Sequence, residues 1–130
     1  EWARQERLGV YKKAIDIMAT QTDDPVAMAA QWQTLLKGEQ AFDLPQLVGI
    51  VQKWTADLLQ MKLANTSRYH GHRDADLRRL SAPAGLSPLL ACQGELMQLQ
   101  AVARHPLNTQ LFLEDMAARY ARALAPLKHK

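Results

Sequence analysis

One cysteine, few aromatic side chains and no long apolar run narrow the classes to which this chain can belong. With Cys92 as its only cysteine the chain has no internal disulfide, which fits a reducing compartment, and we expect a cytoplasmic location. Aromatic residues make up only 6% of the sequence. No apolar run approaches the roughly 20 residues that a membrane-spanning helix needs. We therefore expect a soluble domain with no membrane segment and no membrane partner.

The chain also lacks a strong excess of either charge. It has 16 Lys and Arg against 13 Asp and Glu, which gives a net charge of +3. A nucleic-acid-binding domain usually concentrates its cations on one face. The main cationic cluster here, between Arg68 and Arg79, is interrupted by two aspartates. A helical nucleic-acid-binding domain stays an alternative, and its candidate residues are Arg68, Arg73, Arg78 and Arg79.

Motifs of phosphate binding and of nucleophilic catalysis are missing. Neither G-x-x-x-x-G-K-[S/T] nor G-x-G-x-x-G occurs in the sequence. Cys92 and His105 are a conceivable nucleophile and base, but Cys92 lies mid-helix on an apolar stripe, about three turns from His105. Five carboxylates fall at expected helix starts, where capping and dipole interactions explain them: Asp23, Asp24, Asp43, Glu114 and Asp115. We predict no catalytic residue, no cofactor and no metal, and hence no enzymatic activity of this domain alone.

The segment from Arg68 to Asp76 is the one stretch that resembles a site. Two histidines two residues apart, followed by two aspartates, suggest a metal-binding group: His70, His72, Asp74 and Asp76. Histidines at i and i+2 do not share a helix face, however, and the usual zinc ligands are spaced differently. We interpret the segment as a solvated loop, and a small metal-dependent enzyme built on these four residues stays an alternative.

Helical periodicity is what the sequence has in abundance. Apolar residues recur every three or four positions and predict helices over roughly residues 2–20, 25–37, 43–64, 74–80, 88–103 and 109–124. No segment alternates in the manner of a strand. The sequence therefore predicts an all-α fold, a compact bundle of five to six helices, as a single domain over residues 1–130.

Local signals refine these helices. Polar residues that can accept a hydrogen bond from the first turn predict three helix starts: Asp24, Ser87 and Asn108. In the helix over 88–103 we expect Leu90 and Met97 to extend the apolar face. Gly94 costs helix stability, and a close helix crossing would explain its presence.

The longest predicted helix, over 43–64, is expected to be the centre of the bundle. Its apolar residues follow one another at steps of four and three, the spacing of a helix–helix seam: Leu47, Val51, Trp54, Leu58 and Met61. Ile50, Leu59 and Leu63 are expected to broaden that seam. The final helix has a similar stripe of Leu113, Met116, Tyr120 and Leu124, flanked by alanines that let another helix approach.

Three blocks of this sequence resemble a known family. Gln52-Lys53-Trp54-Thr55-Ala56-Asp57-Leu58-Leu59 followed by Arg68-Tyr69-His70 is similar to the long collar helix and following loop of the delta-prime subunit of the bacterial DNA polymerase III clamp loader. Ala30-Gln31-Trp32-Gln33-Thr34-Leu35-Leu36 resembles the shorter helix before it. His105-Pro106-Leu107-Asn108-Thr109-Gln110-Leu111-Phe112-Leu113-Glu114 resembles the final helix of that subunit. The blocks span nearly the whole chain.

The resemblance implies an all-α C-terminal domain that joins the ATPase subunit and delta in the collar of the clamp loader. That assembly loads the sliding clamp on primed DNA during replication, so DNA and clamp would be reached only through the whole complex. The collar domains of delta and of the ATPase subunit share the fold, and the Trp54–Leu58 block favours delta-prime. The ATP-related and zinc-binding features of the family belong to N-terminal AAA+-like domains. Because the first residue is Glu1, we expect this chain to be a fragment that lacks them.

This interpretation makes the domain a non-catalytic oligomerisation module. We expect the last helix and the central helix each to bury one stripe and to offer part of the remainder to neighbouring subunits. The candidate interface residues are Leu111, Phe112, Tyr120, Arg119 and Trp54.

Overall fold

Helices make up almost all of the part of the chain that the structure, a computed structural model, describes: residues 2–20, 24–38 and 42–125, with side chains from Gly9 onward. In chain order the elements are α1 (Trp2–Thr20), α2 (Pro25–Gly38), α3 (Leu44–Ala64), the 3₁₀ turn η1 (Gly71–Arg73), α4 (Asp74–Ser81), α5 (Leu86–Val102) and α6 (Thr109–Leu124). No strand occurs in these ranges. The prediction of an all-α bundle of five to six helices is confirmed.

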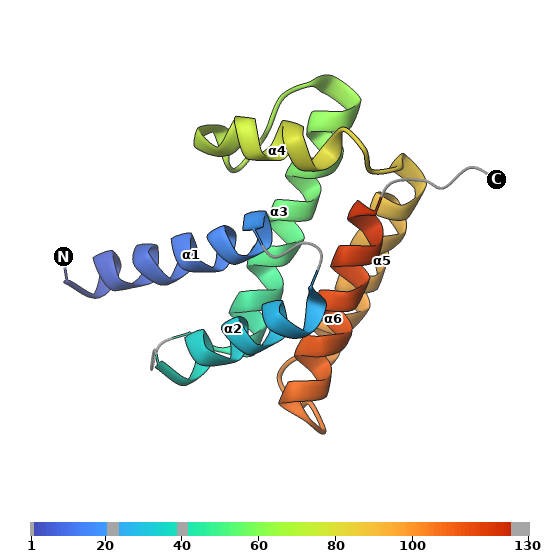
Figure 1. Cartoon of the computed structure of the whole chain (residues 1–130). Helices are drawn as coiled ribbons and strands as arrows, with labels where there is room; N and C mark the ends of the chain where they lie inside the picture. Colours follow the sequence, from blue (N-terminus) through green and yellow to red (C-terminus); the bar gives the residue numbers. More distant parts are fainter. Residues whose placement is uncertain (1, 21–23, 39–41, 126–130) are drawn as a thin grey trace.

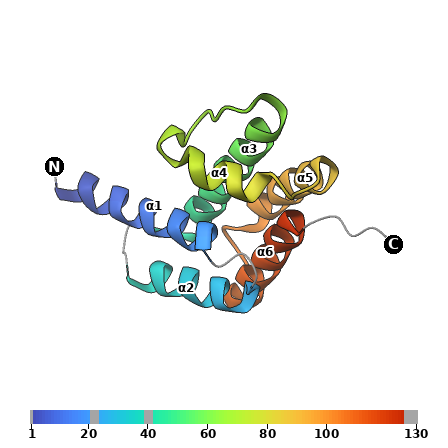
Figure 2. The same ribbon diagram turned by 45° about the horizontal axis from the view of Figure 1, so that its top comes forward.

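The central position of α3 follows from its seam of apolar side chains, and the helix packs against α1, α4 and α5 (Figures 1 and 2). It begins with a capping box, in which the Gln46 N–H donates to the Asp43 carboxylate over 3.0 Å and the Asp43 N–H donates to the Gln46 side chain over 2.9 Å. It ends at Asn65, whose φ of 56° is left-handed. All five seam residues are buried: Leu47, Val51, Trp54, Leu58 and Met61.

The expectation that Leu63 broadens this seam is wrong, because its side chain is 65% exposed. Leu63 follows Trp54 by nine residues, and nine steps of about 100° carry it half a turn around the helix. It therefore lies on the side of α3 opposite to Trp54. Ile50 and Leu59, by contrast, are buried as expected.

A chain of two buried hydrogen bonds ties three helices together at the centre of the bundle. The Trp54 Nε1–H of α3 donates to the Tyr120 hydroxyl of α6 over 2.8 Å, and that hydroxyl donates to the Met18 carbonyl of α1 over 2.9 Å. Met18 lies in the last turn of α1, where carbonyls have no partner within the helix. Burial raises the pKa of Tyr120, so the hydroxyl keeps the proton that it donates.

The remaining helices pack around this centre. α6 lies alongside α5 and also contacts α2, which in turn packs against α1 (Figures 1 and 2). α2 begins as predicted, because the Ala27 N–H donates to the Asp24 carboxylate over 3.1 Å. Its Trp32 is fully buried. The bundle therefore encloses both tryptophans whose side chains are described.

Candidate functional site

The helix α5 combines a buried face with an exposed face that is also apolar. Leu89, Cys92 and Leu96 point into the core, as their spacing predicts. The predicted cap at Ser87 is wrong: α5 begins at Leu86, Gly85 is the capping residue, and no side chain makes the cap hydrogen bond. Since Ser87 falls inside the first turn, its hydroxyl is not placed to accept from the N–H groups that begin the helix.

The exposed side of α5 carries no charge. Its exposed residues are Leu86, Ser87, Leu90, Ala91, Gly94, Met97, Gln98, Ala101 and Val102. Leu86, Leu90 and Met97 fall within about 40° of one another around the helix axis at 100° per residue. We call these three residues, with Gly94 and Ala101 beside them, the α5 surface. A helix that is apolar on all sides normally has neighbours on all sides.

Two expectations about α5 are overturned by this arrangement. Leu90 and Met97 do not extend the core face, because they are 54% and 69% exposed. Gly94 does not mark a close crossing within this chain, since a Cβ added there meets no atom within 4 Å. The apolar residues of α5 occur on all sides of the helix, so periodicity alone cannot identify which of them the other helices cover.

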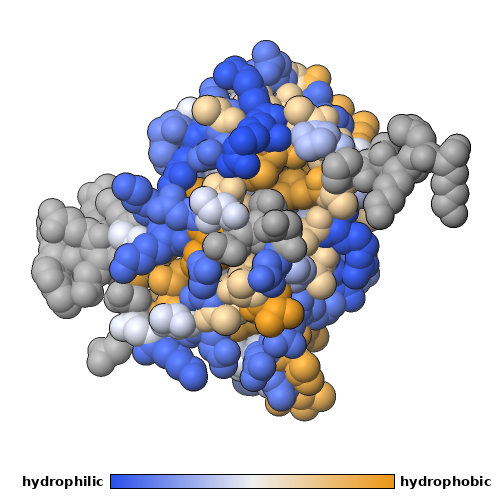
Figure 3. Space-filling view, viewed as in Figure 1, coloured by the Kyte–Doolittle hydropathy of each residue, from blue (hydrophilic) through white to orange (hydrophobic). Residues whose placement is uncertain are grey.

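Exposed leucines continue past the end of α5. Leu107 in the α5–α6 connection is fully exposed, and Leu111 at the start of α6 is 62% exposed. Hydrophobic atoms are visible at the lower tip of the molecule, where this connection lies (Figure 3). The predicted cap of α6 is confirmed, because the Leu111 N–H donates to the Asn108 side chain over 3.0 Å. A local hydrogen bond therefore fixes the start of α6, beside the exposed Leu107 and Leu111.

The five residues predicted for a subunit interface occupy different depths. Trp54 and Tyr120 are fully buried and Phe112 is almost so, which leaves their side chains in the core of this chain. Arg119 is partly exposed and pairs with Glu95 of α5 over 3.2 Å and with Asp115 over 3.0 Å. Leu111 alone presents a largely exposed apolar side chain. The predicted interface stays a prediction. None of its five residues lies on α5, which carries four other exposed apolar side chains: Leu86, Leu90, Met97 and Val102.

The interpretation of residues 68–76 as a solvated loop is wrong for His70, which is only 1% exposed. The buried Asp57 of α3 accepts hydrogen bonds from the backbone N–H groups of Arg68 (2.8 Å), Tyr69 (3.1 Å) and His70 (2.7 Å). His70 Nδ1 lies 2.7 Å from the same carboxylate. We call Asp57 with these three N–H groups the Asp57 anchor. A buried carboxylate requires such donors, so the anchor explains why Asp57 is tolerated in the core.

The other ring nitrogen of His70 extends this network to α1. His70 Nε2 lies 2.9 Å from the Tyr11 hydroxyl. Both contacts suit a neutral imidazole that donates from Nδ1 to Asp57 and accepts at Nε2. Burial lowers the pKa of His70, and the hydrogen bond to Asp57 opposes that shift. Burial, with a smaller effect from Asp57, raises the pKa of Tyr11.

In the sequence, Asp57 stands out only as part of a family block, and no motif marks it as a functional residue. The available signal was its position, three residues after Trp54 on a helix whose neighbouring positions are apolar. A charged side chain at such a position needs a buried partner. The partner segment lies 11 to 13 residues further along the chain, beyond the reach of helix periodicity.

The geometry does not support a metal site built on His70, His72, Asp74 and Asp76. Both ring nitrogens of His70 are engaged, Asp74 accepts a hydrogen bond from Ser67, and Asp76 pairs with arginines. Within residues 2–20, 24–38 and 42–125, no three His, Cys, Asp or Glu side chains gather so as to hold a metal ion.

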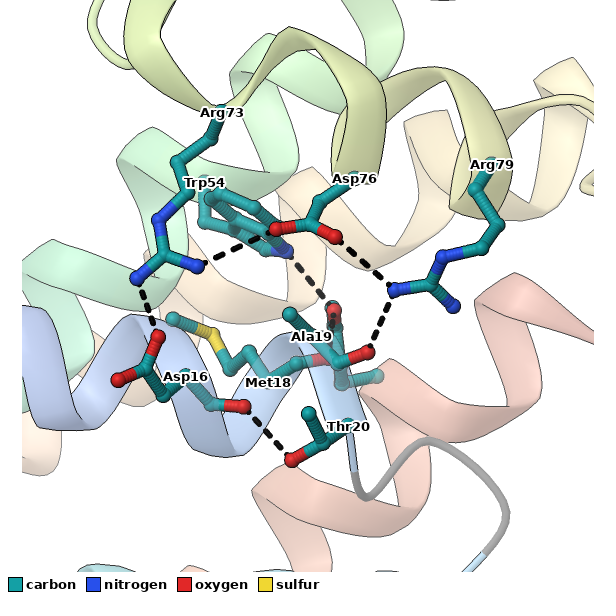
Figure 4. Close-up of polar contacts among 9 residues, drawn as sticks. Asp16, Met18, Ala19, Thr20, Trp54, Arg73, Asp76 and Arg79 are labelled. Carbon is teal, nitrogen blue, oxygen red and sulfur yellow. Dashed lines mark hydrogen bonds and ion pairs between the residues drawn. The ribbon is translucent and has the colours of Figure 1, made fainter.

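The four arginines of the nucleic-acid alternative are also not equivalent. Figure 4 shows Arg73 between Asp16 of α1 and Asp76 of α4, and Arg79 between Asp76 and the Ala19 carbonyl. Their charges are thereby largely neutralised, and they join α4 to α1. Arg78 donates to Asn65. Arg68 is exposed and makes no ion pair with any described residue.

Cys92 and His105 do not form a catalytic pair. Cys92 is 1% exposed, and burial raises the pKa of its thiol to about 12. His105 is exposed after the end of α5. A protonated, buried thiol is a poor nucleophile. Cys92 therefore acts as a packing residue.

None of the helices in the described part of the chain is long and apolar enough to cross a membrane. Comparison of the chain with protein-family models, curated proteins and solved structures finds no match.

Proposed function

We propose that this chain is the collar-type assembly domain of a clamp-loader subunit, similar to delta-prime of bacterial DNA polymerase III. In this function the domain is non-catalytic and joins the ATPase subunit and delta. It contributes to loading the sliding clamp on primed DNA through the complex as a whole. Such a domain acts in the cytoplasm, where replication takes place.

The observation that carries the proposal is the uncharged exposed side of α5. Leu86, Leu90 and Met97 form a stripe that another helix can cover, and Gly94 and Ala101 leave room for a close approach. Burying this stripe removes apolar area from water without stranding a charge. A partner helix with an uncharged apolar face is therefore the occupant that fits.

The α5 surface has the size of an interface that binds one partner weakly by itself and contributes to stable binding within a ring of subunits. A helix of 17 residues is about 25 Å long, and one face of it is about 10 Å wide. This area is well below the roughly 800 Å² per partner of a standard stable interface. A domain that contacts two neighbours at once is held more tightly than by either contact alone, as expected for a closed assembly.

A rigid bundle supports this kind of function. The Trp54–Tyr120–Met18 hydrogen bonds connect three helices, and the Arg119–Glu95 ion pair connects α6 to α5. A domain that anchors moving subunits must itself keep one shape. The buried network favours a single packing arrangement, because any other packing would leave its polar groups without partners.

The test is sedimentation velocity of this chain, at tens of micromolar, mixed with the ATPase subunit and delta of the same organism. The variants are Leu90→Lys and Met97→Lys, which place a charge on the α5 surface. The matched control is Leu63→Lys, an equally exposed leucine on another helix. Circular dichroism melting verifies that each variant folds.

We expect a complex with the wild-type chain and with Leu63→Lys, and at least about tenfold weaker association with Leu90→Lys, since an unpaired charge would be buried. Two results would contradict the proposal: no complex at about 50 μM, or the same affinity for Leu90→Lys as for Leu63→Lys.

A further inference from the structure

The segment that follows α3 is held in one conformation by the Asp57 anchor. Three consecutive backbone N–H groups converge on one buried carboxylate, with distances between 2.7 and 3.1 Å. The segment lies at the edge of the molecule, above α3 and beside α4 (Figures 1 and 2). Loops are normally mobile, whereas this one is tied to the central helix. The backbone that carries the Arg68 and Tyr69 side chains is therefore held in a fixed position.

What they present is an aromatic ring with one cation over it and a second cation on the preceding residue. Tyr69 is 47% exposed. The Lys53 ammonium of α3 lies 5.8 Å from the centre of the Tyr69 ring. Arg68 is the preceding residue, and its side chain is exposed. We call Lys53, Arg68 and Tyr69 the Tyr69 platform.

The acidic groups near the platform are already engaged. Asp57 accepts four N–H groups, Asp74 accepts the Ser67 hydroxyl, and Asp76 pairs with two arginines. Neither Lys53 nor Arg68 forms an ion pair with a residue that the structure describes. Lys53 thus lies over the half-exposed Tyr69 ring, and Arg68 is the preceding residue on the same anchored backbone. Hydrophilic side chains gather over α4 (Figure 3).

We propose that the Tyr69 platform binds single-stranded nucleic acid. One base stacks on the face of the Tyr69 ring that Lys53 does not cover, and Lys53 and Arg68 contact neighbouring phosphates. Stacking on an aromatic side chain is independent of base identity and requires an unpaired base, which favours a single strand over a duplex. The fixed loop matters because the ring need not be ordered on binding. This site is separate from the α5 surface, so it holds or fails independently of the proposed assembly.

The affinity expected of one stacked base and two phosphate contacts is low. Non-specific binding lies at about 10⁻⁴ to 10⁻⁶ M, and this platform belongs at the weak end. Two phosphate contacts to a single strand give a slope of about −1.4 in log K against log salt. Binding is therefore best measured at low salt, where the two cations contribute most.

The experiment titrates this chain into a fluorescein-labelled ten-nucleotide oligothymidylate at about 20 mM salt and follows anisotropy. Tyr69→Ala should weaken binding by about 5- to 150-fold, whereas Tyr69→Phe, which keeps the ring, should stay within about twofold. Arg68→Gln should reduce the salt slope by about 0.7. Arg104→Gln, an exposed arginine after α5, is the matched charge control and should leave binding unchanged.

Several outcomes would overturn the proposal. These are no binding at 1 mM protein, equal losses in Tyr69→Phe and Tyr69→Ala, or a loss in Arg104→Gln as large as that in Arg68→Gln. Equal affinity for a duplex of the same length would exclude stacking. Because Tyr69→Phe keeps both the ring and the anchored backbone, its retained binding distinguishes loss of the ring from loss of the fold.

Discussion

Replacing Tyr120 with phenylalanine removes a single oxygen atom from the centre of the bundle and breaks both of its hydrogen bonds. The Trp54 Nε1–H and the Met18 carbonyl then lose their partner in a site from which water is excluded. Each of the two buried groups left unsatisfied costs about 1–3 kcal/mol, so we expect the free energy of unfolding to fall by about 2–6 kcal/mol. For 130 residues this corresponds to a melting temperature lower by about 7–22 °C.

Urea titration followed by circular dichroism at 222 nm measures this loss, with the slope m compared between proteins. Tyr69→Phe is the control, because Tyr69 is half exposed and its removal of a hydroxyl should cost less than about 0.5 kcal/mol. A double-mutant cycle with Trp54→Phe should give a coupling of about 1 kcal/mol or more. A Tyr120→Phe protein within about 0.5 kcal/mol of the wild type would refute the reasoning.

Three other perturbations test separate parts of the structure. Gly94→Ala should raise the free energy of unfolding by about 0.5–1 kcal/mol in a urea titration, because the added methyl meets no atom within 4 Å and alanine favours the helix. A lower free energy of unfolding would contradict the open surroundings of Gly94. Burial lowers the pKa of His70, so the unfolded chain binds a proton at a higher pH than the folded chain. The free energy of unfolding from a urea titration should therefore fall as the pH drops from 7.5 to 5.5, by no more than about 1.4 kcal/mol for each unit of the pKa difference. This fall should be smaller in His70→Gln. A wild-type midpoint that rises or stays constant would show the sign to be wrong. Burial raises the pKa of Cys92 to about 12, so iodoacetamide at pH 8 should modify the folded chain at least about 100-fold more slowly than the urea-unfolded chain. Equal rates of modification would contradict the burial of Cys92.

The sequence predicted the helices well where their limits depend on neighbours along the chain. Asp24 and Asn108 cap their helices as expected, because an N-cap hydrogen bond spans only two or three residues. The central position of α3 also followed from the sequence, since its apolar seam is long. The cap at Ser87 was wrong by two positions, which is within the usual uncertainty of helix ends.

The candidate site was predicted only in outline. The resemblance to a collar domain directed attention to α6, whereas the exposed apolar residues lie mainly on α5. Periodicity could not separate Leu90 and Met97 from the core, because apolar residues occur on every side of that helix. The cationic cluster was likewise visible in the sequence, but its pairing with Asp16 was not, since the two segments are 57 residues apart.

By itself, then, the sequence determined the helical class, most helix limits and the identity of the central helix, all of which arise from interactions between residues within one or two turns. Only the tertiary structure decided that Asp57 holds the segment at Arg68–His70, that Arg73 and Arg79 are neutralised, and that one side of α5 stays uncovered. Each of these depends on which helix faces which. The packing of the whole chain around Trp54 and Tyr120 determines which helix faces are in contact, and no local sequence pattern predicts these contacts.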